Sequence, residues 1–272
     1  MLDVIYGEAT DAGRVRSNNE DAVSSFIPRS RQVARSHGWM FALADGVGGS
    51  DFGEVASAIA VATLAEEFPQ SQEGTSLVAL MPRLVQHANS AVHNATLTAE
   101  RRGSRMASTI VCCALRNDQA VVSHVGDSRC YHVRGGEAKL VTRDHTWVNE
   151  QRKMGLISAV EAEGSDARHV LVRCLGPELF ISADTATLRI EAGDTIVLCS
   201  DGLHGALTDR QIAEFASHPG RTDEEMQEIT RRMVAHAVEI DGSDNTTAQV
   251  IRIRSVEQVA MYRGRAYKLP SY

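Results

Sequence analysis

The sequence predicts an α+β fold with antiparallel strands, arranged as one compact domain. Helical and strand periodicities occupy separate stretches of the chain, which argues against the regular alternation of a doubly wound parallel sheet. In the middle of the chain, the turn pairs Asn117-Asp118 and Gly135-Gly136 separate short apolar runs, as in β-hairpins. The 272 residues, 43% of them hydrophobic and 23% charged, suffice for the core of such a domain.

The first part of the chain opens with strands and continues with helices. Apolar patterns predict strands over Val4–Ala9, Ala22–Ile27 and Trp39–Ala44. The polar, basic stretch Pro28–Gly38 predicts an exposed loop. Helical spacing of apolar residues then predicts two helices, one from Phe52 to Phe68 that Pro69 ends and one across Thr75–Ala99.

The second part begins with strands and ends with one. Short apolar runs predict an antiparallel meander of Ser108–Leu115, Ala120–Val125, Cys130–Val133 and Lys139–Val141. Residues 145–175 mix short helical pieces with loops and predict a mobile segment. Further strands are expected at Thr195–Cys199 and Thr247–Ile253, between which helices begin at Thr208 and Thr222 with capping-box partners Gln211 and Glu225. The tail from about Ser255 has no clear period.

Composition excludes several classes of protein. The net charge of −7 is a poor match for a nucleic-acid binder. No apolar run approaches the ~18–20 residues that cross a bilayer, and Met1-Leu2-Asp3 lacks the layout of a secretory signal, so a cytoplasmic protein without membrane contact is expected. The five cysteines are odd in number and contain no CxxC, which predicts reduced core residues.

Acidic residues recur where apolar, strand-like runs end. Such residues are Asp45 before Gly46, Asp127 before Ser128, Asp201 before Gly202, Asp244 before the last strand and the pair Glu20-Asp21 before the second strand. A carboxylate at the end of a buried strand must be compensated or take up a proton, and several together repel each other. Divalent cations remove this cost, because Mg²⁺ and Mn²⁺ prefer oxygen ligands. A single Asp-Gly is as readily a simple turn, but the whole set favours a metal site.

The glycine-rich segment after Asp45 has a competing interpretation as a phosphate-binding loop. Its residues 46–51 fail the G-x-G-x-x-G spacing at Asp51, and the chain contains no G-x-x-x-x-G-K-[ST]. Nucleotide binding at this loop is therefore not expected.

Five motifs in order resemble those of the PP2C (PPM) family of metal-dependent protein phosphatases, in its bacterial branch. They are Arg16-Ser17-Asn18-Asn19-Glu20-Asp21, Ala44-Asp45-Gly46-Val47-Gly48-Gly49, Gly126-Asp127-Ser128-Arg129, Ser200-Asp201-Gly202-Leu203 and Asp244-Asn245. The resemblance spans about residues 5–253 and extends to the segment 169–176, which is similar to the family's segment after the flap. It implies a four-layer α-β-β-α sandwich of two antiparallel sheets flanked by helices. It also implies a PP2C-like domain over residues 1–254, with a flap-like segment at about 145–175, followed by a C-terminal tail over 255–272.

The resemblance further implies an active site with two Mn²⁺ or Mg²⁺ ions. Asp45 would bridge the two ions and Asp201 and Asp244 would complete one of them. The carbonyl of Gly46, with Glu20 and Asp21 acting partly through water, would serve the other. Arg16 would bind the phosphate, since a guanidinium matches phosphate oxygens. Two cations that share a water lower its pKa, and the resulting hydroxide would hydrolyse phosphoserine or phosphothreonine in proteins without a phosphoenzyme.

Two positions depart from the family pattern. Val47 stands where some members have a histidine proposed as the general acid, so the proton donor is left open. Gly205 stands where many members have an acid that completes a third metal site, so a third ion at Asp127 and Asp201 is expected to bind weakly, with a structural role for Asp127 as the alternative. His145 and His169, which flank the flap-like segment, are expected to be structural or surface residues.

The expected partners are phosphorylated proteins and a bacterial serine/threonine kinase whose action the enzyme opposes, with the enzyme itself a monomer. One alternative is a non-catalytic PP2C-like binding module, but this predicts lost metal ligands, and Asp45, Asp201 and Asp244 are all present. Another alternative is a phosphatase dedicated to one regulatory protein, a type that usually carries sensory domains.

Overall fold

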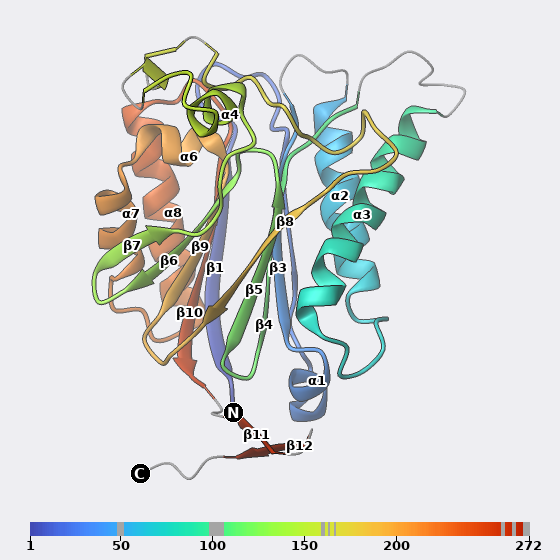
Figure 1. The fold of residues 1–272 in the computed structure, drawn as a ribbon. Helices are drawn as coiled ribbons and strands as arrows, with labels where there is room; N and C mark the ends of the chain where they lie inside the picture. The colour runs from blue at the N-terminus through green and yellow to red at the C-terminus, as the bar shows by residue number, and fades with distance from the viewer. Residues whose placement is uncertain are drawn as a thin grey trace.

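The computed structural model describes residues 1–47, 52–97, 106–158, 161–162, 164–165, 167–256, 259–262 and 265–268. Two five-stranded antiparallel sheets pack face to face, with helices on their outer faces (Figure 1). This arrangement confirms the predicted four-layer α-β-β-α sandwich.

One sheet carries the early strands of the chain. Its order is β2 (Asp21–Phe26), β3 (Trp39–Asp45), β4 (Ile110–Arg116), β5 (Gln119–Val125) and β8 (Asp184–Arg189). The long helices α2 (Gly53–Glu67) and α3 (Leu77–Thr96) cover its outer face (Figure 1). The short helix α1 (Arg31–Ser36) connects β2 to β3.

The other sheet joins the first strand to the late part of the chain. Its order is β1 (Asp3–Asp11), β10 (Thr246–Ser255), β9 (Thr195–Cys199), β6 (Arg129–Arg134) and β7 (Glu137–Leu140). Its outer face is covered by α6 (Asp201–Ala206), α7 (Asp209–Ala216) and α8 (Asp223–Ile240). After β10, the strands β11 (Val259–Tyr262) and β12 (Arg265–Lys268) pair as a hairpin.

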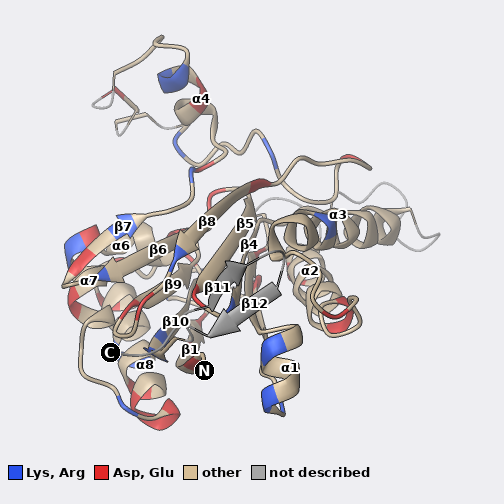
Figure 2. Cartoon of the chain, turned by 60° about the horizontal axis from the view of Figure 1, so that its bottom comes forward, with Lys and Arg blue, Asp and Glu red and all other residues tan. Residues whose placement is uncertain are grey.

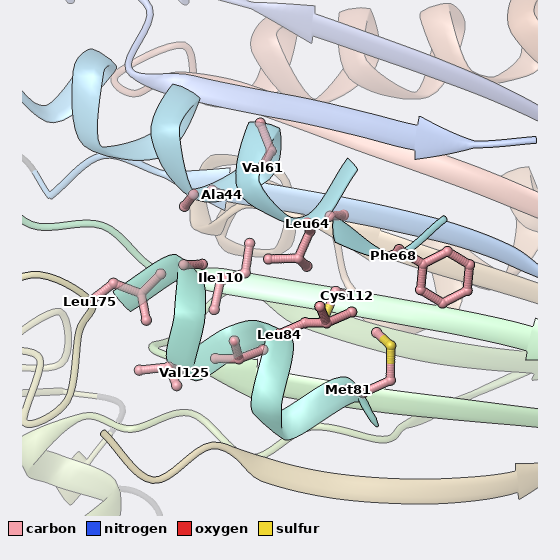
Figure 3. Packing of buried hydrophobic residues seen from close by; sticks show 14 of the residues in the cluster. Ala44, Val61, Leu64, Phe68, Met81, Leu84, Ile110, Cys112, Val125 and Leu175 are labelled. Atoms are coloured by element: carbon pink, nitrogen blue, oxygen red, sulfur yellow. The ribbon is translucent and has the colours of Figure 1, made fainter. Parts of the chain in front are cut away.

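Strand β3 illustrates why the central strands are apolar throughout. Met40, Ala42 and Ala44 point to the core beneath α2 and α3, where Figure 3 shows Ala44 among side chains of both helices. The alternate residues Phe41 and Leu43 pack into the layer between the two sheets. Because both faces of β3 are covered, its sequence lacks the polar–apolar alternation of a half-exposed strand.

Several local predictions were wrong. The expected loop Pro28–Gly38 contains α1, which forms because the Ser30 side chain caps it and Ala34 is buried beneath it. The expected meander is divided, since β4 and β5 lie in one sheet and β6 and β7 in the other. Gly126, with a φ of +106°, turns the chain from β5 toward the second sheet, and a Cβ there would collide with Thr109.

Other elements were missed or only half predicted. Strand β8, helix α6 and the hairpin in the tail were not expected from the sequence pattern. Thr208 and Gln211 form the predicted capping box. At α8 the Thr222 side chain accepts from the backbone of Glu225, but the Glu225 carboxylate accepts from the backbone N–H of Arg221 instead of returning to Thr222.

Helix α4 (Trp147–Lys153), in the chain between β7 and β8, stands apart from the sheets in Figure 2. We call residues 145–172, which include this helix, the flap. Its two ends are tied together where Trp147 N–H donates to the Val170 carbonyl at 2.8 Å and Val172 N–H donates to the His145 carbonyl at 2.9 Å. The His145 ring stacks on His124 of β5 with 4.7 Å between centroids, and its Nδ1 accepts from Gly126 N–H at 3.1 Å. His145 is therefore a buried structural residue at the base of the flap, as predicted.

In the part of the chain that the structure describes, none of the helices has the length and apolar character needed to cross a bilayer. All five cysteines are free thiols, and four of them are buried, as the sequence predicted. Burial raises the pKa of the Cys112 and Cys199 thiols to about 12, which keeps them protonated and unreactive.

Candidate metal and phosphate site

An open pocket of about 750 Å³ is lined by residues from the ends of strands in both sheets and by residues of the flap. It collects nearly all the site residues that the sequence singled out, namely Arg16, Glu20, Asp45, Gly46, Asp127, Asp201 and Asp244. Val47 and Gly205, the two positions that depart from the family pattern, also line it. Residues that are more than 200 positions apart in the sequence thus share one wall.

The aspartates come from the ends of central strands in both sheets. Asp45 is the last residue of β3, and Asp127 follows β5 in the same sheet. Asp201 begins α6 two residues after β9 ends, and Asp244 precedes β10 in the other sheet. The two-sheet stacking therefore converts separate strand ends into one cluster of carboxylates.

Asp45 is held by its backbone. Its N–H donates to Thr109 Oγ1 at 3.0 Å, and its carbonyl accepts from Thr109 N–H at 2.8 Å. The next residue must be glycine, because a Cβ on Gly46 would lie 2.4 Å from the backbone of Gly53 at the start of α2. These contacts fix the Asp45 carboxylate at the strand end while leaving its oxygens to face the pocket.

Asp21 occupies a different place from the other predicted ligands. It pairs with Asp45 across β2 and β3 but is not part of the pocket wall. Its Oδ2 accepts from Ser200 Oγ at 2.8 Å, and its buried Oδ1 has no hydrogen-bond partner among the described residues. A buried carboxylate oxygen without a partner is costly. Because this oxygen lies behind the Asp45 carboxylate, it is suited to bind a cation or a water that a cation orients.

The electrostatics of the cluster show what it lacks. Burial, together with Asp21, Asp201 and other neighbouring carboxylates, raises the pKa of Asp45 well above its usual value. Burial also raises the pKa of Asp21 to about 7, against hydrogen bonds from Thr247 and Ser200. Burial and the nearby Asp201 likewise raise the pKa of Asp127 to about 7. The carboxylates cannot all ionise cheaply, so the site fits bound divalent cations, which supply the missing positive charge.

Arg16 lies at the pocket edge with its Nη2 2.7 Å from Asp244 Oδ2. This hydrogen bond, against some desolvation, raises the pKa of Arg16 and keeps it charged. A guanidinium has five N–H donors, so this one contact leaves others that can bind phosphoryl oxygens.

Sequence reasoning gave Asn245 no role, although it organises the loop that carries Arg16 and Glu20. Its Oδ1 accepts from Glu20 N–H at 2.8 Å, while its Nδ2 donates to the carbonyls of Ala12 and Asn18 at 3.0 and 2.9 Å. The signal was its position beside Asp244, but the partners lie more than 220 residues away and no local pattern reveals them.

Two histidines at the pocket were also not assigned to it. His169, which was expected at the surface, is half exposed, and its Nδ1 lies 3.6 Å from Asp201 Oδ2. With Asp127 and Asp201 it forms a group whose ligand atoms lie within 4.8 Å of one another. His204 donates from Nε2 to the Asp127 carbonyl at 3.0 Å, which ties α6 to the turn after β5. Burial opposes ionisation of Asp201, but the contacts with His169 and His204 outweigh it and lower the pKa of Asp201.

Comparison with known proteins gives a consistent result. The family model described as protein phosphatase 2C matches residues 13–239. Protein phosphatase PhpP of Streptococcus pneumoniae is 30% identical over 244 residues, which cover 89% of this chain and 94% of that protein.

Solved structures extend the likeness to three dimensions. The crystal structure of the Mycobacterium tuberculosis serine/threonine phosphatase PstP/Ppp superposes with a TM-score of 0.79 at 30% identity, covering 93% of this chain and all of that one. A structure of the PstP catalytic domain in complex with two manganese ions gives a TM-score of 0.75 at 32% identity, covering 93% of this chain and 99% of that one.

Proposed function

Because this chain belongs to the protein phosphatase 2C family, we propose that it is a metal-dependent phosphatase that removes phosphate from phosphoserine and phosphothreonine in proteins. The observation that carries this proposal is the convergence of Asp45, Asp201 and Asp244 with Arg16 around one open pocket. A bare cluster of buried carboxylates is unfavourable, whereas the same cluster around cations forms a catalytic centre.

The residues present fit two Mn²⁺ or Mg²⁺ ions, and a related structure holds two manganese ions. We assign one ion to Asp45, Asp201 and Asp244, and the other to Asp45, Glu20 and the Gly46 carbonyl. The orphaned Oδ1 of Asp21 supports an indirect role for this carboxylate behind the second ion. When bound, such cations lower the pKa of water to give a nucleophile at neutral pH and neutralise charge on the phosphoryl group.

The contribution of the protein is to bind and orient the substrate. Arg16 faces the pocket and is anchored by Asp244, so its remaining N–H groups can bind phosphoryl oxygens in a fixed position. Positioning of the phosphoryl group is the larger part of catalysis in phosphoryl transfer. The side chain of Val47 can neither accept nor donate a proton, so it does not protonate the leaving oxygen.

A third ion would be held by Asp127 and Asp201. Gly205 supplies no carboxylate, which supports weak binding, although His169 lies close enough to both aspartates to contribute a nitrogen ligand. The contact of His204 with the Asp127 backbone supports the alternative, in which the Asp127 turn is primarily structural.

Phosphorylated proteins are the substrates that this function requires. We further propose that a serine/threonine kinase is the opposing partner, that the protein acts as a monomer, and that residues 1–254 form the phosphatase domain and 255–272 a separate tail. A second function, partner binding without catalysis, is not favoured. A non-catalytic module is expected to have lost metal ligands, whereas Asp45, Asp201 and Asp244 are all present.

The test is release of phosphate from a phosphothreonine peptide by wild-type protein and by Asp45→Asn, with Mn²⁺, Mg²⁺ or EDTA. The expected result is turnover that depends on the cation and that both EDTA and the substitution abolish. Folded wild-type protein, checked by circular dichroism, that releases no phosphate with either cation would overturn the enzymatic proposal and favour a binding module.

A further inference from the structure

A second cavity of about 360 Å³ adjoins the active-site pocket at the base of the flap. It lies between the chain that follows β7 and the last turn of α4, where Figure 2 marks Lys and Arg in blue. Arg129, Asp144, Asn149 and Arg152 line both this cavity and the active-site pocket. The two spaces therefore share a wall, and one extended substrate segment can reach both.

The cavity is basic in an acidic protein. Four of its lining residues are cationic, Arg129, Arg143, Arg152 and Lys153, whereas Asp144 is the one carboxylate in the lining. We call this cavity the basic pocket. Its lining carries a formal charge of 4 − 1 = +3, although the chain as a whole carries −7.

Contacts within the protein leave most of this charge uncompensated. Arg129 uses Nε and Nη2 to bind Asp144 at 3.0 and 2.7 Å, so these two residues neutralise each other. Arg143 touches Glu150 at 3.2 Å in a half-exposed pair, a type that contributes little. Among the described residues, no carboxylate lies within ion-pair distance of Arg152 or Lys153.

We propose that the basic pocket binds a second phosphoryl group of the substrate, so that doubly phosphorylated segments of proteins are preferred substrates. This inference rests on the proposed function, because it concerns the residues next to the hydrolysed phosphate. A phosphoryl group carries nearly two negative charges, and guanidinium forks match its oxygens. A glutamate side chain would neutralise only one charge, and a nucleic acid would meet the acidic remainder of the protein.

The test compares peptides that share one phosphothreonine. One has no other anionic residue, a second carries a non-hydrolysable phosphonate analogue of phosphoserine, and a third carries glutamate at that position. The second group is placed two, four or six residues away on either side. The pocket variant is Arg143→Gln/Lys153→Gln, two residues that do not line the active-site pocket. The control Arg29→Gln/Arg31→Gln removes the same charge beside and within α1, which Figure 1 shows at the opposite end from α4.

At one or more spacings, the phosphonate is expected to raise kcat/KM about fivefold to tenfold, mainly through a lower KM, with a smaller gain for glutamate. The pocket variant should lose this gain, while the control keeps it and both hydrolyse the singly phosphorylated peptide within about twofold of wild type. The gain should also shrink at high salt.

Equal rates at all spacings, an equal loss in both double variants, or an equal gain from glutamate would overturn the inference. Hydrolysis of the singly phosphorylated peptide reports separately on the proposed function. Binding of a fluorescent peptide with phosphonates at both positions, measured by anisotropy, tests the basic pocket even without turnover. Equal affinity of the wild type and the pocket variant in that measurement would also count against it.

Discussion

Strand β9 has an aspartate near each end, and the charges that surround the two differ. Asp194, at the start, has a side chain that is only 1% exposed and is fully partnered: Arg134 donates two hydrogen bonds to it at 2.7 Å, Glu191 N–H donates at 2.8 Å, and His132 Nε2 lies 2.9 Å away. Although burial opposes it, these contacts lower the pKa of Asp194. Against burial, His169 and His204 lower the pKa of Asp201, after the other end, but Asp201 lies among the carboxylates of Asp21, Asp45 and Asp127.

The difference separates structural from functional burial of charge. At Asp194 the chain provides its own cations, so the carboxylate stabilises the fold. In the pocket, Arg16 interacts with three acids, Asp244, Glu20 and Asp201, and the pKa values of Asp21 and Asp127 are raised to about 7. The balancing charge must come from outside the chain, which supports the proposed metal site at the second end of β9.

The largest contrast is expected in activity. Asp201→Asn should lower kcat/KM on a phosphothreonine peptide by more than about a hundredfold, because even the outer partners of metal ligands are worth 10- to 100-fold. Asp194→Asn should remain within about twofold of wild type below its melting temperature. Steady-state assays with saturating Mn²⁺ check both, and similar losses in the two variants would break the comparison.

The contrast should reverse in stability. Asp194→Asn is expected to lower the free energy of unfolding by about 2 kcal/mol, less than a fully buried pair because Arg134 is half exposed. This corresponds to a loss of about 4–8 °C in Tm for a chain of this size. In EDTA, Asp201→Asn should lower the melting temperature by less than Asp194→Asn does, because the repulsion relieved at Asp45 and Asp127 offsets the lost contact with His169. Differential scanning calorimetry measures both.

Removal of Asn245 tests how far the site depends on its supporting amide. Asn245→Ala should weaken Mn²⁺ binding about tenfold, because the Glu20 loop loses its three hydrogen bonds. The control Asn18→Ala keeps the backbone carbonyl that accepts from Asn245 and should bind like wild type. Isothermal titration calorimetry gives the two affinities, and an unchanged affinity in Asn245→Ala would remove its assigned role.

A smaller effect is expected from pH on the metal-free protein. Asp21 and Asp127 have folded-state pKa values of about 7, above those of the unfolded chain, so the folded state binds more protons. Stability in EDTA should therefore fall as pH rises from 6.5 to 8, a range above the lowered pKa values of the buried His124, His145 and His204. Thermal melts should show a decrease of a few degrees.

Two controls sharpen this pH experiment. Mn²⁺ should restore the Tm most strongly at pH 8, where the carboxylates are ionised, and Asp127→Asn should flatten the pH dependence. A Tm in EDTA that is constant or rises from pH 6.5 to 8 would mean that repulsion among the ionised carboxylates of the pocket does not destabilise the folded protein.

Most of the proposed ligands that meet at the pocket could be predicted from the sequence, because each of them sits where an apolar run stops. Buried strands such as β3 are apolar on both faces, so a terminal Asp45 stands out against them. The division of β4–β5 from β6–β7 could not be predicted in this way, because strands in either sheet have the same local pattern and only the turn at Gly126 directs the chain. Long-range ties were also hidden: nothing near Asn245 or His204 in the sequence identifies the backbone groups that they bind.

The pairing of β1 with β10 joins the first and last strands of the two sheets over the span from Asp3 to Asp11. The loop after β1 carries Arg16 and Glu20, and the loop before β10 carries Asp244 and Asn245. The site is therefore complete only when both loops are in place. During synthesis on the ribosome, the beginning of the chain emerges long before these last residues. A nascent chain would thus stay catalytically silent until Asp244 and Asn245 have been synthesised, and the closing of this distant strand pair is the step expected to limit how fast activity appears.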